Sequence, residues 1–222
     1  MQKLAENLWL LRYPLRLLGA DLQRNVAVLR LSSGDLVIHS TGPFTPEDVA
    51  AVNALGQPRW LLDTMLRHET FARRGREAFP DAVYLAPEGF SELAGFPTGP
   101  LVDQPEWSGE VEVTRLDGVP GMEEHAVLHR PTRTLIVADL IFNFGTGASW
   151  WTHFLMCGAV GVKHDPGTAR SIRWQARDRA ALRASLARMM AWDFDRLIVG
   201  HGDPIETGAK TQVAAALGRA GY

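Results

Sequence analysis

Three polar positions in the sequence follow short apolar runs. Asp139 comes directly after Leu-Ile-Val-Ala, and His201 stands between two glycines after Leu-Ile-Val. His68 and Glu69 lie in a polar segment that follows a third apolar run, Trp-Leu-Leu. Carboxylates and imidazoles act as metal ligands and as general acids or bases. Because α/β folds place ligands beyond the carboxyl ends of their strands, we expect these groups to open on one rim.

Each of these residues also has a purely structural interpretation. Asp139 can cap the turn after its strand, and His201 can pack within a turn bounded by glycines. His68 and Glu69 can open the helix that follows, where the helix dipole favours a carboxylate. A functional interpretation therefore depends on whether the strands bring these side chains together.

The rim depends on strands, which we predict from apolar runs of alternating or continuous hydrophobicity. These runs cover residues 8–15, 25–31, 36–39, 60–62, 82–85, 111–116, 126–129, 134–138 and 195–199. Both halves of the chain begin with hairpin strands and continue with strand–helix alternation. This order predicts an α/β (α+β) fold of two sheets covered by helices, a four-layer αββα sandwich, as one domain over residues 1–222.

Helices are expected between these strands. The first begins at the N-cap Thr45, with Pro46 in the first turn and Asp48 completing a capping box, and ends at Gly56. The other helices are expected at residues 71–79, at 88–93, after the cap Asp178 and after the cap Thr207. Residues 95–109 and 143–170 are expected to be irregular because they are rich in glycine and proline or in glycine alone.

The composition narrows the classes of protein. The chain has 222 residues, 46% of them hydrophobic, and its 23 basic and 25 acidic residues give a formal charge of -2. These values argue against a disordered chain and against nucleic acid as a partner. The single cysteine excludes an internal disulfide and a CxxC zinc knuckle. The N-terminal residues lack the apolar run of a signal peptide, and no run is long enough for a bilayer, so we expect a cytoplasmic protein with no membrane partner.

Two of the strand-end motifs resemble those of a known family. Residues 199–204, Val-Gly-His-Gly-Asp-Pro, look like the last histidine motif of the metallo-β-lactamase superfamily. Residues 135–142 look like the segment that carries its bridging aspartate, here Asp139. The order of elements is similar over nearly the whole chain. The resemblance implies the metallo-β-lactamase-like αββα fold and metal-dependent hydrolysis, with Asp139 and His201 as metal ligands.

The resemblance is incomplete at the other ligand positions. The family's early loop reads His-x-His-x-Asp-His, and those positions here hold Met65, Arg67, Glu69 and Thr70. A small shift brings His68 into line with one ligand. The family's middle histidine should fall in residues 118–122, which keep the turn glycines and end in methionine. The resemblance therefore implies a branch of the family with a degenerate metal-binding motif.

The number of candidate ligands indicates whether the sequence predicts a bound metal ion. A catalytic zinc ion usually has three protein ligands and an open position for water. Asp139 and His201 are two candidates, His68 is a third, and Glu69 and His125 are outside candidates. This count favours no specific metal, and a single zinc or other divalent ion is the alternative.

Without a metal, the carboxylate of Asp139 needs another positive partner. We expect Arg67 in this place because its guanidinium is always charged and pairs with a carboxylate through two hydrogen bonds, and His68 is the alternative. Trp150 and Trp151 either roof a cleft for an apolar ligand or join the core. Arg67, Trp150 and Trp151 are thus the candidate substrate-binding residues.

The remaining polar residues of the glycine-rich segment have less specific interpretations. Cys157 lies in an apolar context and is expected to be a small buried residue. His153 and His164 flank the same segment and either line a pocket or are solvated. Trp150, Trp151 and residues 95–109 are a candidate homodimer surface.

Two functions stay open at this point. The first is a hydrolase-like protein in which Asp139 or Glu69 orients a water for attack on a small ester, lactone, thioester or phosphoester. The second is a non-catalytic relative that binds a ligand or a partner in the same cleft. The missing ligands favour the second function, whereas the retained Asp139 and His201 favour the first.

Overall fold

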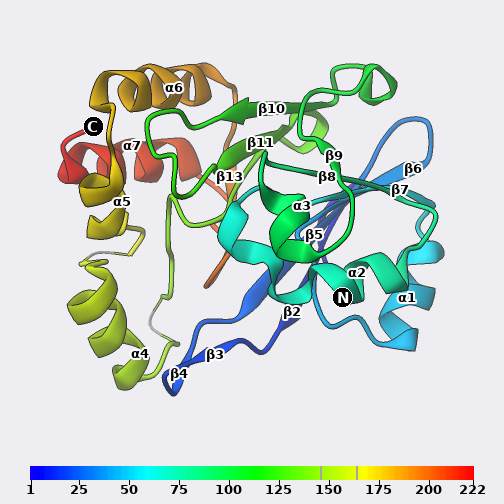
Figure 1. The fold of residues 1–222 in the computed structure, drawn as a ribbon, viewed down its shortest axis with the longest axis horizontal. Coiled ribbons are helices and arrows are strands. Elements are labelled where there is room, and N and C mark those ends of the chain that lie inside the picture. The colour runs from blue at the N-terminus through cyan, green and yellow to red at the C-terminus, as the bar shows by residue number, and fades with distance from the viewer. Residues whose placement is uncertain (146, 164) are drawn as a thin grey trace.

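Two β-sheets form the centre of the molecule in a computed structural model that describes residues 1–145, 147–163 and 165–222 (Figure 1). One sheet has the strand order β1-β2-β5-β6-β7-β8-β9, the other has the order β10-β11-β12-β13, and β3 and β4 form a separate hairpin. The strands are β1 (Gln2–Ala5), β2 (Leu8–Tyr13), β3 (Arg16–Leu17), β4 (Ala20–Asp21), β5 (Arg24–Arg30), β6 (Asp35–His39), β7 (Gln57–Leu62), β8 (Val83–Ala86), β9 (Gly99–Pro100), β10 (Val111–Arg115), β11 (His125–His129), β12 (Thr134–Val137) and β13 (Arg196–Val199).

Helices connect and cover the strands. The α-helices are α1 (Pro46–Asn53), α2 (Ala72–Ala78), α3 (Phe90–Ala94), α4 (Trp150–Leu155), α5 (Arg170–Gln175), α6 (Arg179–Ala191) and α7 (Ala209–Ala220). Shorter 3₁₀ turns are η1 (Leu66–Phe71), η2 (Pro105–Trp107) and η3 (Arg130–Thr132), and η4 (Met156–Val160) is a π-helical turn. No helix within the described ranges has both the length and the apolarity that a membrane crossing requires.

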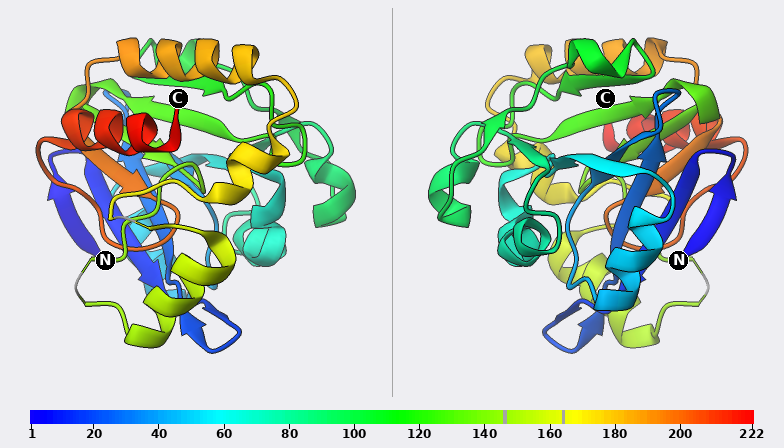
Figure 2. Two further views of the ribbon diagram at one scale, coloured as in Figure 1. Left: turned by 90° about the vertical axis from the view of Figure 1, so that its left-hand side faces the viewer. Right: turned by 90° about the vertical axis from the view of Figure 1, so that its right-hand side faces the viewer.

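The two sheets pack face to face over a buried apolar layer. Ala27 and Leu29 of β5 contribute to this layer together with Val127, Ile136 and Ile198 of the smaller sheet. The outer face of the larger sheet packs on α1, α2 and α3, and the outer face of the smaller sheet packs on α5, α6 and α7. Figure 2 shows these helices on the outer sides with the strands between them. The predicted four-layer αββα sandwich is confirmed.

Parallel pairing brings two strand ends to one edge. In the smaller sheet β12 and β13 run parallel, and Val137 pairs with Val199 at their carboxyl ends. In the larger sheet β6, β7 and β8 also run parallel. The residues that directly follow β12 and β13 therefore lie beside one another at the same edge.

Capping signals account for several helix boundaries. The side chain of Thr45 accepts the Asp48 N–H and the Asp48 carboxylate accepts the Thr45 N–H, so the predicted capping box is present. Asp178 caps α6 as predicted, through the N–H groups of the first turn. The prediction for Thr207 is wrong, because Gly208 in a left-handed conformation is the N-cap of α7. The first helix also ends at Asn53, before Gly56.

The predicted irregular segment 143–170 is the main error in the element assignment. It contains α4 and η4, and α5 begins at its end. Ser149 caps α4 by accepting the Thr152 N–H. Helix α4 exposes aromatic side chains, including Trp150, to solvent. Its sequence therefore lacks the separate apolar and polar faces from which a helix is predicted. Cys157 on η4 is exposed, which corrects the expectation that it is buried.

Candidate metal centre

Three polar side chains from separate elements meet at the edge where β12 and β13 end. Asp139 follows β12, His201 follows β13 across Gly200, and His68 comes from η1 beyond the end of β7. The structure therefore brings together the two strand-end residues and the histidine of the polar segment. These three are the only group of potential metal ligands among the described residues.

The distances in this group suit a single metal ion. Oδ1 of Asp139 lies 3.4 Å from Nε2 of His68 and 3.4 Å from Nε2 of His201. The ligand atoms of the three residues all lie within 4.8 Å of one another. Ligand atoms about 2.1 Å from a tetrahedral zinc ion are themselves roughly 3.4 Å apart. Nε2 of His68 and Oδ1 of Asp139 are buried without a hydrogen bond to any described residue, so the residues fit a divalent ion.

The backbone around His201 fixes the direction of its imidazole. Nδ1 of His201 lies 2.7 Å from the carbonyl oxygen of Gln23, which can only accept, so Nδ1 carries the proton and donates. The lone pair of Nε2 is then free for a metal, an arrangement typical of metal-binding histidines. A Cβ atom at Gly200 would lie 2.7 Å from the carbonyl oxygen of Ala138 and 3.1 Å from Cε1 of His68. The motif therefore needs glycine here for space.

A buried carboxyl group holds the loop that carries Asp139. Oε1 of Glu124 accepts hydrogen bonds from the backbone N–H groups of Ala138, Asp139 and Leu140, over 2.9, 3.2 and 3.1 Å. Glu124 is buried. Three successive donors on one oxygen fix the backbone at Asp139 and hence the position of its side chain.

A buried arginine lies beside the three residues. Nη2 of Arg24 donates to the carbonyl oxygen of His68 over 3.0 Å and lies 3.4 Å from Oδ1 of Asp63. Thr41 and Tyr84 donate to the other carboxylate oxygen of Asp63. Burial raises the pKa of Asp63 to about 6, so at neutral pH it stays the charged partner of Arg24. This network fixes η1 on the larger sheet.

The protonation states also suit a cation. Burial, followed by the charge of Arg24, lowers the pKa of His68 to about 4. Burial likewise lowers the pKa of His201. Burial alone raises the pKa of Asp139. The opposite effect of His68, His201 and Arg24 is larger, so the pKa of Asp139 lies below its ordinary value. At neutral pH the imidazoles are neutral and the carboxylate is ionised, the forms that bind metals.

A cavity of about 550 Å³ opens directly on this group. Arg24, His68, Asp139 and His201 line its polar end. Most of its other lining residues are apolar and come from the β3–β4 hairpin region, α4, η4 and α5. The volume lies within the range of small-molecule sites, so the three residues have direct access to a ligand.

The other predicted site residues lie in different positions. Arg67 is exposed and donates to Gln175 over 3.1 Å, so the expected pairing with Asp139 is wrong and the alternative, His68, is the residue beside that carboxylate. Arg67 does line the rim of the cavity. Glu69 does not line it, although its Oε2 is buried without a hydrogen bond to any described residue.

The aromatic pair does not line this cavity either. Trp150 is 76% exposed and Trp151 is 37% exposed, so neither joins the core. Both lie on α4, whose last residue Leu155 lines the cavity. Nε2 of His153 donates to the carbonyl oxygen of Gly145, and His164 lies outside the described residues.

Arg24 and Glu124 are parts of the site that the sequence reasoning did not find. Arg24 is the first residue of the apolar strand β5, and Glu124 directly precedes the apolar strand β11. Charged residues at such places are usually solvated, so their type and position alone give no reason to place them inside. A signal exists only in combination with the neighbouring strand ends, where buried N–H groups after β12 require an acceptor and the carboxylates require a counter-charge.

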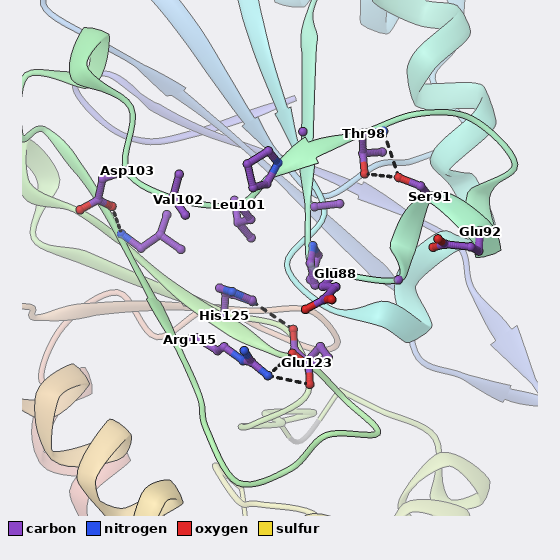
Figure 3. A pocket seen from close by; sticks show the side chains of 16 residues that line it. Glu88, Ser91, Glu92, Thr98, Leu101, Val102, Asp103, Arg115, Glu123 and His125 are labelled. Atoms are coloured by element: carbon purple, nitrogen blue, oxygen red, sulfur yellow. Dashed lines mark hydrogen bonds and ion pairs between the residues drawn. The ribbon is translucent and has the colours of Figure 1, made fainter.

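A second and larger pocket, of about 920 Å³, lies elsewhere, between the α3–β9 region and the strands β10 and β11 (Figure 3). Figure 3 shows Arg115, Glu123 and His125 at its β10–β11 end. Arg115 pairs with Glu123 over 2.7 Å, and Nδ1 of His125 donates to the Glu123 carbonyl oxygen. His125, an outside candidate for the metal, therefore belongs to this pocket and not to the group with Asp139.

Comparisons with known proteins bear on the fold of the chain. No family model matches the chain, and no curated protein matches its sequence. Solved structures do match: the metallo-β-lactamase DIM-1 has a TM-score of 0.65 and 15% identity, over 99% of this chain and 96% of that one. A metallo-β-lactamase from Erythrobacter litoralis has a TM-score of 0.67 and 15% identity, over 98% and 95%.

A third solved structure is the metallo-β-lactamase FIM-1 from Pseudomonas aeruginosa, described as its mono-zinc form. It has a TM-score of 0.65 and 11% identity, and the match covers 99% of this chain and 95% of that one. Identities this low bear on the fold and not on the reaction. Together with the two sheets and their helical layers, these matches show that the chain has the metallo-β-lactamase fold.

Proposed function

We propose that the protein is a hydrolase that uses one divalent metal ion held by His68, Asp139 and His201. The observation that carries the proposal is the convergence of these side chains, with ligand atoms within 4.8 Å of one another, on a cavity of about 550 Å³. The metal-binding motif is reduced from that of the family, and its third ligand, His68, aligns with a family ligand only after a small shift. Small esters, lactones, thioesters and phosphoesters are the candidate substrates, by analogy with the family.

The metal, when bound, would act as a Lewis acid on a carbonyl or phosphoryl oxygen of the substrate. The residues of the chain supply the rest. Gln23 holds His201 in the tautomer that presents Nε2. Asp139 turns Oδ1 toward both imidazoles, and its other carboxylate oxygen would orient an attacking water by accepting a hydrogen bond from it. Arg24 adds a fixed positive charge where negative charge develops.

A non-catalytic ligand-binding protein is the second candidate function. Met65 stands where the resemblance places a metal-binding histidine, and Met122 ends the segment in which the middle histidine is expected. Both line the cavity with buried apolar side chains. Replacement of polar ligands by methionine favours retention of an apolar ligand over hydrolysis. The two candidates differ in whether a metal binds and whether a bond is cleaved.

Metal uptake by the purified protein tests the proposed site. We expect about one zinc, manganese or iron ion per chain and a rise in melting temperature, since at a free metal concentration 100 times Kd the native state gains about 2.7 kcal/mol. His68→Ala, His201→Ala and Asp139→Asn should each abolish uptake and thermal shift. His153→Ala, outside the group, is the matched control and should behave as wild type. Wild-type protein without uptake would contradict the metal site.

Hydrolysis is measured separately on the loaded protein. A panel of short-chain esters, lactones, thioesters and phosphoesters is incubated with the protein before and after metal addition. Turnover that appears with metal and disappears in Asp139→Asn supports the hydrolase. Metal binding without turnover of any panel member would favour the ligand-binding alternative.

A further inference from the structure

We propose that the cavity beside His68, Asp139 and His201 binds one alkyl chain of an amphiphilic ligand, whose polar group lies at these three residues. The inference deepens the proposed function, on which it rests for the place of the polar group. It names a class of ligand, a single-chain amphiphile such as an alkyl ester or alcohol, that the resemblance to the family does not supply.

The wall of the cavity divides by burial. Apart from Arg24, His68 and His201, every lining residue that is buried is apolar: Leu22, Met65, Met122, Phe142, Met156, Ala169 and Ile172. Of the other polar lining residues, Arg16, Arg67 and Thr70 are exposed, and Ser171 and Gln175 on α5 are half-buried. A sugar or peptide portion placed along this wall would lose hydrogen bonds to water without replacement, whereas an alkyl chain gains from burial.

Two of the buried apolar lining residues are methionines. Met65 and Met122 carry flexible thioether side chains in the wall of the cavity. Methionine adapts to the shape of its neighbours and so suits a chain that can adopt several conformations. Because His68, Asp139 and His201 lie together at one place in this wall, the cavity suits a ligand with one polar head group and an apolar chain.

The apolar lining continues to the outside. Leu17 at the rim belongs to the β3–β4 hairpin, which lies beside α4 at one end of the molecule (Figures 1 and 2). Trp151 on α4 donates to the carbonyl oxygen of Leu18 over 3.0 Å. Leu17, Leu18, Trp150, Trp151 and Phe154, called here the aromatic patch, are solvent-exposed, with Leu18 at 75% and Phe154 at 62%. A chain longer than the cavity would extend onto this patch.

Binding of 1-alkanols from butanol to decanol, measured by calorimetry in the presence of EDTA, tests the chain site without any metal or reaction. An uncharged head avoids repulsion from Asp139. We expect affinity to rise about fourfold with each added methylene until the cavity is filled, because each buried methylene contributes about 0.8 kcal/mol. Equal affinity along the series, or no binding, overturns the proposal.

Variants locate the chain. Met156→Gln places an amide in the buried wall and should weaken octanol binding by at least tenfold, with little effect on butanol. Met190→Gln, on α6 and away from the cavity, is the matched control. If Met156→Gln does not fold, Leu17→Gln at the exposed rim tests the longer chains instead. Unchanged octanol affinity in a folded Met156→Gln or Leu17→Gln protein overturns the placement.

Two further arms separate the source of the chain. Binding to dissolved monomers supports a free amphiphile, whereas sedimentation with phosphatidylcholine vesicles that is lost in Leu18→Ser supports uptake from a lipid surface through the aromatic patch. Failure of both overturns the proposal. Zinc uptake without a dependence of affinity on chain length would support the proposed function and contradict this inference. A dependence on chain length without zinc uptake would contradict only the metal site.

Discussion

The glycine before His201 shows how one absent side chain shapes the site. A Cβ atom at Gly200 would approach the Ala138 carbonyl oxygen to 2.7 Å and Cε1 of His68 to 3.1 Å. Either β13 must move away from β12 or the His68 ring must move away from Asp139. Since β12, β13 and η1 position the three ligand atoms, one added methyl group would displace these atoms relative to one another.

Gly200→Ala should therefore lower the free energy of unfolding by about 1 to 3 kcal/mol and weaken zinc binding by about 10- to 100-fold. Urea denaturation and competitive zinc titration measure the two effects. Gly218→Ala on α7 is the control, because a Cβ atom there meets nothing within 4 Å. Zinc affinity equal to that of wild type would show that His68 and His201 do not share a metal.

Glu124 acts through the backbone of its neighbour. Its Oε1 is the acceptor for the N–H groups of residues 138–140. Glu124→Leu leaves these donors unpaired in the interior and should cost about 3 kcal/mol or more, whereas Glu124→Gln keeps an oxygen acceptor and should cost less. In both urea denaturation and zinc titration, stability and zinc affinity should be highest for wild type, lower for Glu124→Gln and lowest for Glu124→Leu. Equal values for the two variants would contradict this role of the oxygen.

At the scale of elements, the sequence predicts strands better than the segments that cover the site. Apolar runs identified β5, β11, β12 and β13 because burial on two faces leaves an uninterrupted signal. Asp139 and His201 follow from these runs, since parallel neighbours end at one edge. The first choice for the partner of Asp139 was wrong and the alternative was right, because a shift of one residue in η1 exchanges Arg67 for His68. α4 was missed because its exposed face is aromatic.

Strand β11 carries a buried histidine that gives the fold a pH dependence. Burial lowers the pKa of His129 to about 4, whereas the unfolded chain titrates near its ordinary value of about 6.5. Between these values the unfolded state binds a proton that the folded state does not, so the unfolding free energy falls as the pH falls. The contribution of His129 to this decrease in unfolding free energy should reach about 3 kcal/mol at pH 4. It levels off at lower pH because both states then bind the proton.

His129→Gln removes this dependence. Urea denaturation at a series of pH values from 7 to about 4 should show the difference between wild type and His129→Gln shrinking or reversing as the pH falls. His153→Gln, at a half-exposed position, controls for the loss of an imidazole elsewhere. A constant difference at all pH values would mean that the pKa of His129 is the same in the folded and unfolded states, which contradicts the shift.

At the scale of the whole molecule, one side chain joins the two sheets behind the site. Nδ2 of Asn25, on β5 of the larger sheet, donates to the carbonyl oxygens of Val199 and Gly202 over 2.8 and 2.7 Å. Its backbone N–H donates to the Gly200 carbonyl oxygen. The chain around His201 is therefore held by the opposite sheet, and the sheets also share one apolar layer. We expect them to unfold together in one transition.

Asn25→Asp replaces both donors with carboxylate oxygens that face two carbonyl oxygens. The change should lower the free energy of unfolding by about 2 to 4 kcal/mol and weaken zinc binding, because His201 loses its support. Asn53→Asp at an exposed position of α1 is the matched control and should change stability by about 0.5 kcal/mol or less. Urea denaturation followed by both circular dichroism and tryptophan fluorescence measures the effect. Coincident transitions at a lower midpoint are expected, whereas separate transitions for the two probes would mean that the sheets fold independently and that the site is not built by their junction.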